Sequence, residues 1–275
     1  NAIFLSQYSD VSIYRGVITG LNEAFIIDTE TKNKIVKSDP KSGELIKPYV
    51  NGTDSKAWHV ENEGDTWFIN TYFDTEISSK TYKGIYNHLK QYEKELKNRQ
   101  DKGKTHFNLR ACDYYDKFSQ PKIIYIYTAL EHYFYFDTSG LYFNNSSYMI
   151  SNGDLFLSCW LNSPIFNFYK KQKFVAYGNA IDGGRNKLDY NKMVNVPIPI
   201  VSESTKKEFE EIAVKLQTVS QELYKKSAQF ISLFMADVAK PQLSVTGAIA
   251  SSDGISRISK RFRNWYLHDF DWFLS

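Results

Sequence analysis

The sequence has 275 residues, of which 42% are hydrophobic and 24% charged, so it can bury the core of one large domain or two small ones. Its formal net charge of +3 neither requires nor excludes a polyanionic partner such as DNA. No apolar run approaches the roughly 20 residues of a membrane span, and no charged leader precedes an apolar stretch, so we expect a cytoplasmic protein without a membrane partner.

The first part of the chain is predicted to form strands joined by polar loops. β-branched and aromatic residues around Gly16 and Gly20 predict two short strands with a turn between them over residues 13–28. Residues 29–43 are polar and charged, which favours a loop, and residues 66–73 are typical of a further strand.

The middle of the chain carries both helix and strand patterns. Apolar residues at helical spacing predict one amphipathic helix over residues 82–99. Two runs rich in β-branched and aromatic residues, at 122–127 and 132–137, predict strands.

Two helix starts are expected further along. Asp154 is placed to cap a helix that runs to about Trp160, and Pro164 restarts or kinks that helix before Lys170. A short strand is predicted after it, over residues 174–177.

The last third is predicted to be helical after an extended hinge, because two prolines keep residues 196–200 out of a helix. Thr205 and Glu208 form a capping-box pattern at the start of one long helix over residues 205–238, which Pro241 ends. The apolar stripe of this helix is compatible with a coiled-coil seam, but packing on its own domain is the interpretation we favour. The stripe consists of Phe209, Ile212, Leu216, Val219, Leu223, Phe230 and Phe234.

Beyond this helix, a Ser- and Gly-rich loop over residues 244–254 leads to a basic and aromatic segment over 255–275, which is predicted to be a helix that docks back. The whole pattern predicts an α+β fold. A mixed β-sheet domain with flanking helices is expected over residues 1–200, followed by a long-helix C-terminal region over residues 201–275 that packs on it.

No motif indicates catalysis. The five histidines lack metal-site spacing, and neither a phosphate-binding loop nor a nucleophile elbow is present, so we expect no catalytic residue, metal or cofactor in this chain. Asp39, Glu44 and Lys47 resemble a nuclease metal site, but two residues rather than one separate Glu44 from Lys47, which argues against that role. Cys112 and Cys159 lie far apart in apolar or aromatic surroundings and are predicted to be buried thiols.

Several phrases of the sequence, taken in order, resemble a known family. They are RGVITGLNEAF at 15–25, SDP at 38–40, LIKPYVNG at 45–52, FNLR at 107–110, PKII at 121–124, LNSP at 161–164, VPIP at 196–199, NWY at 264–266 and FDWF at 270–273. Their order and spacing resemble the TaqI-like C-terminal specificity domain, or target-recognition domain, of type II and type IIG adenine-specific restriction-modification proteins.

This resemblance implies a module for sequence-specific recognition of double-stranded DNA in a bacterial restriction-modification system. A covalently preceding methyltransferase domain, absent here, would methylate adenine at N6 with S-adenosylmethionine. Type IIG members would also carry a nuclease domain and act as restriction endonucleases. The chain starts at Asn1 rather than Met, which is compatible with a piece of such a protein, and by itself it is predicted not to be an enzyme.

The glycine-rich stretch 178–187 is our first choice for base reading. It ends in Arg185, Asn186 and Lys187, whose side chains suit contacts to bases and phosphates. A solvated loop without a partner is the alternative.

Residues 15–22 form a second candidate loop. Arg15, Thr19 and Asn22 surround two glycines that would let the backbone approach a phosphate closely. An ordinary strand-turn-strand is the alternative.

Three further residues, Lys47, Asn51 and Arg110, are second-tier candidates for DNA contact. Surface ion pairs are the alternative for Lys47 and Arg110. The basic residues at 257–263 suit either a phosphate backbone or an acidic neighbouring element, so they stay outside the main prediction.

Two other classes of function remain open. A protein-interaction scaffold would use the long helix and the aromatic tail to bind a partner subunit, and salt-independent protein binding without duplex binding would favour it. A complete small enzyme would need a pocket of convergent titratable groups, which the sequence does not predict.

Overall fold

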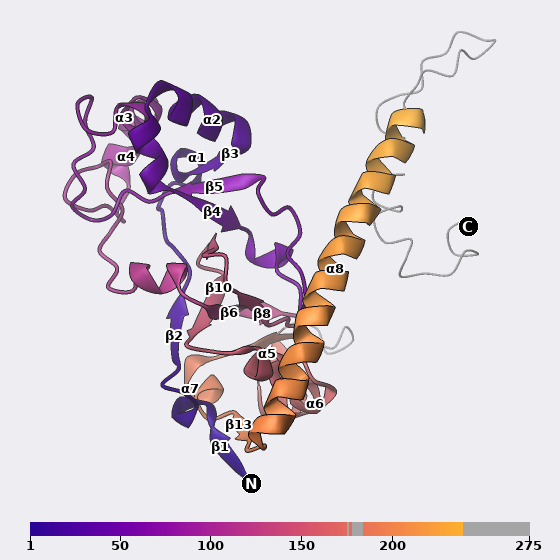
Figure 1. The fold of residues 1–275 in the computed structure, drawn as a ribbon. Helices are drawn as coiled ribbons and strands as arrows, with labels where there is room; N and C mark the ends of the chain where they lie inside the picture. Colours follow the sequence, from indigo (N-terminus) through magenta and orange to yellow (C-terminus); the bar gives the residue numbers. More distant parts are fainter. Residues whose placement is uncertain (175, 178–183, 239–275) are drawn as a thin grey trace. The chain divides into compact units, whose positions relative to one another are not determined.

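The computed structural model describes residues 1–174, 176–177 and 184–238, and it has the predicted α+β fold (Figure 1). Two compact units divide within helix α8 (Glu203–Val238), at residues 1–218 and 219–275. The domain boundary expected at residue 200 stays a prediction. None of the helices in the described residues has the length and hydropathy that a membrane crossing requires.

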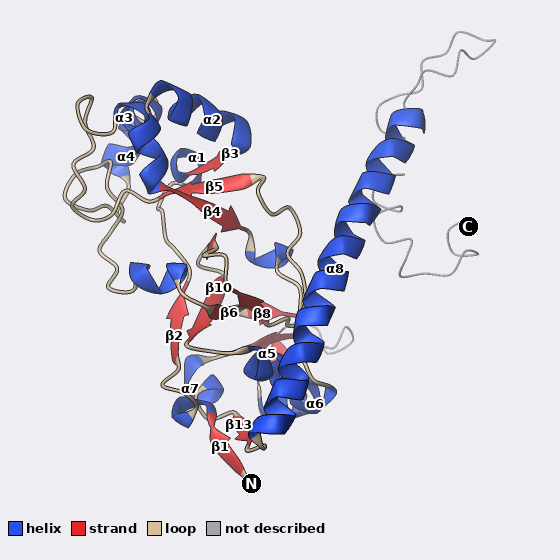
Figure 2. Cartoon of the chain, in the orientation of Figure 1, coloured by secondary structure: helices blue, strands red, loops and turns tan. Residues whose placement is uncertain are grey.

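An antiparallel sheet of order β2-β10-β6-β8 forms the middle of the first unit (Figure 2). Its strands are β2 (Ser12–Arg15), β6 (Lys122–Ile126), β8 (Tyr135–Asp137) and β10 (Ser147–Ser151). Ile124 and Met149 belong to one hydrophobic core, and Ile123 and Ile150 belong to another. Since alternate residues of a strand face opposite sides, each face of the sheet packs on a core. Burial on both faces explains the near-continuous apolar run that predicted a strand here.

A second sheet, of order β3-β5-β4-β9, carries helices α1 to α4 beside it (Figure 1). Its strands are β3 (Ile26–Asp28), β4 (Ile46–Val50), β5 (Thr66–Ile69) and β9 (Tyr142–Phe143), and only β4 and β9 pair in parallel. The helices are α1 (Asn22–Phe25), α2 (Thr29–Ser38), α3 (Lys83–Lys90) and α4 (Glu93–Asn98). Since α1 and β3 occupy the second half of residues 13–28, the prediction of two plain strands with a turn is only partly right.

Helix α2 corrects the prediction of a loop over residues 29–43. The Asp28 carboxylate accepts a hydrogen bond of 2.7 Å from the Thr31 amide and so caps the helix. Ile35 is the helix's buried residue. A helix that buries so little apolar surface lacks the periodic pattern from which a helix is predicted.

The amphipathic helix predicted over residues 82–99 is divided in two. Tyr92 interrupts the helical backbone between α3 and α4, with φ −107° and ψ 18°. Ile85, Leu89 and Leu96 are nevertheless buried together, as their spacing indicates. The predicted apolar face is therefore right, and the predicted continuity is wrong.

The helix starts expected at Asp154 and Pro164 are confirmed in α5 (Leu155–Leu161) and α6 (Pro164–Lys173). The Asp154 carboxylate accepts a hydrogen bond of 2.8 Å from the Leu157 amide. The strand predicted over 174–177 is β11 (Ala176–Tyr177), which pairs with β12 (Arg185–Lys187). Strand β12 also pairs with β7 (Thr128–Ala129).

Residues 196–200 form a strand rather than the predicted hinge. Strand β13 (Pro197–Pro199) pairs antiparallel with β1 (Ala2–Phe4), and Ile198 between the two prolines is buried. The extended conformation that the prolines impose is therefore used for pairing at a two-stranded edge. Short helix α7 (Tyr190–Met193) precedes this strand.

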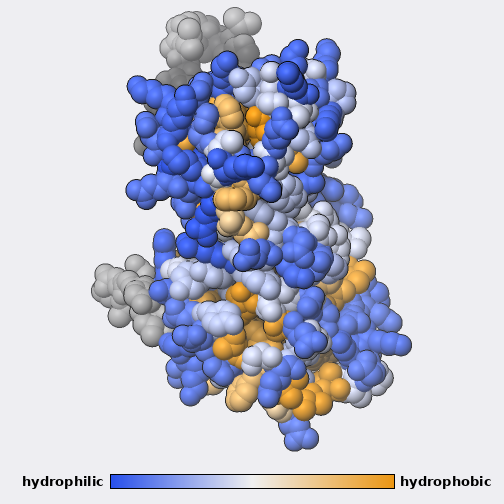
Figure 3. Space-filling view, turned by 90° about the vertical axis from the view of Figure 1, so that its left-hand side faces the viewer, coloured by the Kyte–Doolittle hydropathy of each residue, from blue (hydrophilic) through white to orange (hydrophobic). Residues whose placement is uncertain are grey.

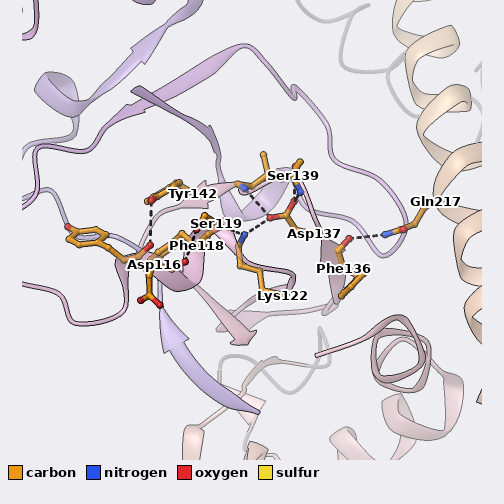
Figure 4. Close-up of polar contacts among 11 residues, drawn as sticks. Asp116, Phe118, Ser119, Lys122, Phe136, Asp137, Ser139, Tyr142 and Gln217 are labelled. Carbon is orange, nitrogen blue, oxygen red and sulfur yellow. Dashed lines mark hydrogen bonds and ion pairs between the residues drawn. The ribbon is translucent and has the colours of Figure 1, made fainter. Parts of the chain in front are cut away.

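Helix α8 begins two residues before its predicted start. The Ser202 hydroxyl accepts a hydrogen bond of 3.2 Å from the Thr205 amide, so the cap is Ser202 and not Thr205. The helix is attached to the first unit through Gln217, whose amide donates a 3.0 Å hydrogen bond to the Phe136 carbonyl (Figure 4). Predictions for Pro241, the loop at 244–254 and the segment at 255–275 lie outside the described residues.

Candidate nucleic-acid interface

Arg15 ends β2, an edge strand of the central sheet, and its side chain is exposed. Its Nε donates a hydrogen bond of 2.9 Å to the Asn145 carbonyl in the turn before β10. That bond uses one of the five N–H groups of a guanidinium, so the terminal nitrogens can still form a fork for a phosphate or a base edge.

A pair of stacked tyrosines connects Arg15 to the first-choice candidates. Tyr148 lies directly opposite Arg15 in the ladder, and its ring stacks on Tyr127 at a centroid distance of 4.8 Å. The ammonium of Lys187 lies 5.2 Å from the Tyr127 ring centroid. Two cations that are far apart in sequence therefore flank one aromatic pair.

Asp189 moderates the charge at the Lys187 end of this pair. Its carboxylate lies 3.6 Å from the Lys187 ammonium and accepts a 2.9 Å hydrogen bond from the Tyr127 hydroxyl. Because both side chains of the ion pair are partly exposed, the attraction is worth little and does not bar a phosphate from Lys187.

Arg110 lies at the other end of the candidate surface, near the Tyr114 phenol. Burial raises the pKa of Tyr114 to about 12, and the positive charges of Arg110 and Arg15 oppose the rise. Tyr114 in turn stacks on Tyr14 of β2 at 4.6 Å. The surface ion pair that is the alternative for Arg110 is present, since its guanidinium lies 3.5 Å from the Asp101 carboxylate, and both partners are exposed.

A pocket of about 260 Å³ lies beside these arginines. Residues 16–18 and 110–115, together with Phe118, line it. Its volume falls just below the roughly 300–1,000 Å³ of typical small-molecule sites. The pocket therefore suits one chemical group of a larger ligand that lies across the surface better than an enclosed metabolite.

Arg185 and Asn186 differ in accessibility although they are neighbours on β12. Arg185 is exposed, whereas Asn186 is 6% exposed and lies between its strand partners Ala129 and Ala176. In this conformation Asn186 is placed for a structural role and Arg185 for contact with a ligand. The glycine-rich residues 178–183 of the first-choice loop lie outside the described residues.

Thr19 and Asn22 are hydrogen-bonded to each other within one turn. Thr19 is 3% exposed, and its hydroxyl donates a hydrogen bond of 2.6 Å to Asn22 Oδ1 and accepts one of 3.2 Å from the Leu21 amide. Thr19 therefore serves the turn into α1, while Asn22 remains exposed at the start of that helix.

Gly16 is required for a close approach between two segments of this chain. A Cβ atom at this position would lie 2.0 Å from the Asn144 carbonyl oxygen. The need for glycine at this position is explained by the backbone of residues 143–144, and the expected approach to a phosphate stays a prediction.

Sequence reasoning missed Arg99, whose side chain stabilises the loop at residues 15–22. Its buried guanidinium donates to the carbonyls of Thr19, His106 and Asn108 and lies 4.6 Å from the Phe25 ring centroid. Burial lowers the pKa of Arg99 to about 10, so it remains protonated at neutral pH. No local motif marks an arginine that binds only backbone carbonyls.

Lys47 and Asn51 belong to the region of the other sheet. Lys47 is half-buried on β4 opposite Phe68. Asn51 is exposed and donates through its side chain to Asp54 at 3.2 Å, at the start of a short 3-10 helix. Neither residue joins the contacts that connect Arg15 with Lys187.

Asp39, one of the acidic residues that resembled a nuclease site, has partners within its own sheet-and-helix region. Asp39 accepts hydrogen bonds of 2.6 Å from the Ser42 hydroxyl and 3.1 Å from the Gly84 amide, and so ties α3 to the segment after α2. Within the described ranges, His, Cys, Asp and Glu side chains form no group of three or more that could hold a metal ion.

A second pocket, of about 330 Å³, contains a buried pair of titratable groups. The Lys170 ammonium lies 3.5 Å from His132 Nδ1. Burial and the neighbouring Lys170 lower the pKa of His132 to about 4, so the imidazole is neutral at pH 7. Burial also lowers the pKa of Lys170. The pair shares the pocket with Glu131, and His132 also forms a hydrogen bond with the backbone of Tyr127.

Tyr127, Tyr148 and Asn145 are the interface residues that sequence reasoning missed. Aromatic residues within β-rich runs are typical of core strands, so the sequence gives no signal that these rings join two cationic segments. Figure 3 views the side on which β2 lies in Figure 1, where hydrophilic residues are interrupted by hydrophobic ones gathered in the lower half.

Comparison with known proteins gives similarities in structure but none in sequence. No protein-family model matches the sequence, and no curated protein matches it. The solved structure of the type IIL restriction-modification enzyme MmeI in complex with DNA is similar at a TM-score of 0.54 and 15% sequence identity. The chain shares its fold with part of MmeI. The match covers 86% of this chain and 29% of the MmeI chain.

The structure of the type IIG restriction endonuclease BpuSI is also similar, at a TM-score of 0.47 and 11% identity, over 77% of this chain and 26% of that one. That second similarity is too weak to define a fold. At these identities the likeness to MmeI concerns the fold, and the chain spans less than a third of the MmeI length.

Proposed function

We propose that this chain is a sequence-specific double-stranded DNA recognition module of a restriction-modification enzyme. The observation that carries the proposal is the fold shared with part of MmeI, a restriction-modification enzyme whose structure was solved in complex with DNA. The sequence phrases that resemble the TaqI-like specificity domain support the same function. This support comes from the residues and is separate from the shared fold.

The surface that joins Arg110, Arg15 and Lys187 is the proposed contact with the DNA backbone. Arg15 and Arg110 are exposed, and Arg110 lines one pocket together with Gly16, the neighbour of Arg15. Lys187 lies beyond the Tyr148–Tyr127 stack. Cations held on strand ends by aromatic neighbours fix the register of a protein on a duplex without reading its sequence. Arg185, exposed on β12, is the proposed reader of a base edge, because a guanidinium pairs with guanine through two hydrogen bonds.

In this proposal the chain selects the site and another part of the parent protein performs the chemistry. A covalently preceding methyltransferase domain would transfer a methyl group from S-adenosylmethionine to adenine N6, and a nuclease domain, where the parent has one, would cleave the DNA. The chain would hold none of the cofactor itself. This division follows from the resemblance stated above, and its test is the activity of the full-length parent.

The recognition role is tested by selecting duplexes from a random-sequence pool at low salt and sequencing the bound fraction. We expect one short motif to be enriched and its affinity to fall steeply with salt, because contacts to phosphates release counterions. Arg185→Ala should relax the preference at one position of that motif. Lys34→Ala, which removes an exposed cation from α2, is the matched control and should leave the motif unchanged.

Absence of any enriched motif, with the chain shown to be folded by circular dichroism, would contradict the proposal for this chain. Equal binding to all duplexes with a steep salt dependence would leave only a nonspecific DNA-binding function, and salt-independent capture of a protein would favour a scaffold.

A further inference from the structure

The pocket of about 330 Å³ that contains Lys170 and His132 lies at the start of helix α6. Its volume is within the range of roughly 300–1,000 Å³ that is usual for small-molecule sites. All of its lining residues belong to the first unit. They are residues 57–58, 131–134, 161–164, 166–167 and 170.

One face of α6 presents polar groups to this pocket. Ser163, Asn167 and Lys170 line it, and their spacing of four and three residues places them on the same helix face. Ser163 caps the helix, because its hydroxyl oxygen accepts a hydrogen bond of 3.1 Å from the Phe166 amide. The Ser163 O–H, the Asn167 amide and the Lys170 ammonium can all donate. Donors therefore gather at a helix N-terminus, where partial positive charge favours an anion.

Lys170 is a buried cation that lacks a counter-ion. The residue is 4% exposed, and its ammonium approaches His132 Nδ1 at 3.5 Å. That contact is long for a hydrogen bond, and an ammonium has three N–H groups. None of the ion pairs among the described residues includes Lys170. A buried ammonium without a counter-ion is costly, which points to a ligand that supplies the negative charge.

His132 has a further unsatisfied polar atom beside Lys170. The residue is 7% exposed and lines the same pocket. Its Nε2 is buried and, within the described residues, has no hydrogen-bond partner of acceptable geometry. Two neighbouring buried side chains thus keep hydrogen-bonding capacity for a group that enters the pocket.

Glu131 is the acidic residue of the lining, and a neighbouring side chain engages it. It is exposed, and its carboxylate accepts a hydrogen bond of 2.6 Å from the Tyr133 hydroxyl. Solvent screens its charge, so it weakens an anion in the pocket only modestly. The aromatic members of the lining are Trp58, Tyr133, Phe134 and Phe166.

We propose that this pocket binds the phosphate group of a small phosphorylated molecule, with Lys170, Asn167 and the start of α6 as donors. Phosphate suits this set better than a carboxylate does, because its additional oxygens accept from more donors. The aromatic lining would contact the organic part of the ligand. A duplex is a poor source of the group, since DNA is stiff and the ammonium is 4% exposed. The proposal does not depend on the proposed DNA function.

The test titrates inorganic phosphate into the whole chain at constant ionic strength and measures the heat by isothermal titration calorimetry. We expect one site per chain. Lys170→Met should weaken binding about tenfold or more, because it removes a charged donor and keeps an unbranched side chain. Lys171→Met is the matched control, since Lys171 is an exposed neighbour on α6 that does not line the pocket.

Stability without phosphate gives a second readout. Lys170→Met should unfold at a higher temperature than the natural chain in a chloride buffer, since it no longer buries an ammonium with free donors. Phosphate should then raise the melting temperature of the natural chain and of Lys171→Met more than that of Lys170→Met. Circular dichroism checks that each variant is folded.

A measurement on the natural chain covers the case in which Lys170→Met does not fold. Phosphate should slow the reductive methylation of Lys170 severalfold and leave that of Lys171 unchanged, as mass spectrometry of the digested chain would show.

Absence of phosphate binding, equal binding by the two lysine variants, or a lower melting temperature for Lys170→Met would each overturn the proposal. Displacement of phosphate from Lys170 by an excess of nonspecific duplex would assign the group to a DNA backbone, and a small phosphorylated ligand would then be excluded.

Discussion

The Lys122 ammonium and the Asp137 carboxylate form an ion pair of 2.5 Å with no exposed surface on either side chain. The two residues are direct partners in the ladder between β6 and β8. Lys122 also donates to the Phe118 carbonyl at 2.6 Å, and Asp137 accepts from the Leu141 amide at 2.9 Å (Figure 4). Burial lowers the pKa of Lys122, an effect that the charge of Asp137 and its hydrogen bond oppose.

Removal of one partner should therefore be far more costly than removal of a surface ion pair. We expect Lys122→Met to lower the free energy of unfolding by about 3–5 kcal/mol, because it leaves a buried carboxylate without its cation. Urea denaturation monitored by circular dichroism measures the change.

Lys34→Met is the matched control, since it breaks an exposed pair with Glu30 and should change stability by less than about 1 kcal/mol. Similar losses in the two variants would show that the buried pair contributes nothing particular.

His132 should make the first unit less stable in mild acid. Its pKa in the folded protein, about 4, lies below the value of 6.5 for an unperturbed histidine, so the unfolded chain takes up the proton first as the pH falls. The contribution is complete above pH 6.5 and is lost progressively towards pH 4, by at most about 3 kcal/mol.

The check compares urea denaturation at several pH values for the natural chain and for His132→Gln, which cannot be protonated. The variant should show a shallower decrease of stability over that pH interval. Parallel curves for the two proteins would mean that His132 is not the group responsible.

Gly16→Ala should destabilise the fold by about 1–3 kcal/mol, because the new Cβ would lie 2.0 Å from the Asn144 carbonyl oxygen and the backbone must move. Gly43→Ala is the matched control, since its nearest neighbour would be Val36 at an ordinary 3.6 Å. Thermal unfolding of both variants distinguishes them. Equal melting temperatures would remove the structural explanation of Gly16.

Arg15→Gln should weaken DNA binding without changing the selected sequence. The variant keeps a hydrogen-bonding side chain but loses one proposed phosphate contact, so the slope of log K against log salt should decrease by about 1. Fluorescence anisotropy at several salt concentrations measures the slope. An altered sequence preference with an unchanged slope would instead place Arg15 on a base edge.

Sequence patterns predicted those elements whose signals are local. Asp154 and Pro164 mark helix starts through the chemistry of single positions, and both were located correctly. Helix α2 was missed because Ile35 is its buried residue, and the hinge was wrong because the pairing of β13 with β1 joins opposite ends of the first unit. Pairing over such a distance in sequence leaves no trace in either segment.

Only the cationic residues of the candidate interface could be predicted from the sequence. Arg15, Arg110, Arg185 and Lys187 were named from residue type and loop context, and their part in DNA binding stays a prediction. Their connection through Tyr127 and Tyr148 depends on the register of β10 against β2, which no single segment specifies. Thr19 and Asn186 have suitable chemistry but are buried, and burial of a polar residue in a turn or short strand is decided by tertiary packing.

The pairing of β1 with β13 also affects how the first unit can be exchanged between proteins. Ala2 lies opposite Pro199, so the first strand of the first unit lies next to the segment that leads into α8. A segment whose two ends are adjacent can be cut out and replaced by another of the same fold with two neighbouring junctions, and the flanking polypeptide keeps its path. Grafting residues 2–199 between homologous hosts is thus a practical route to chimaeras.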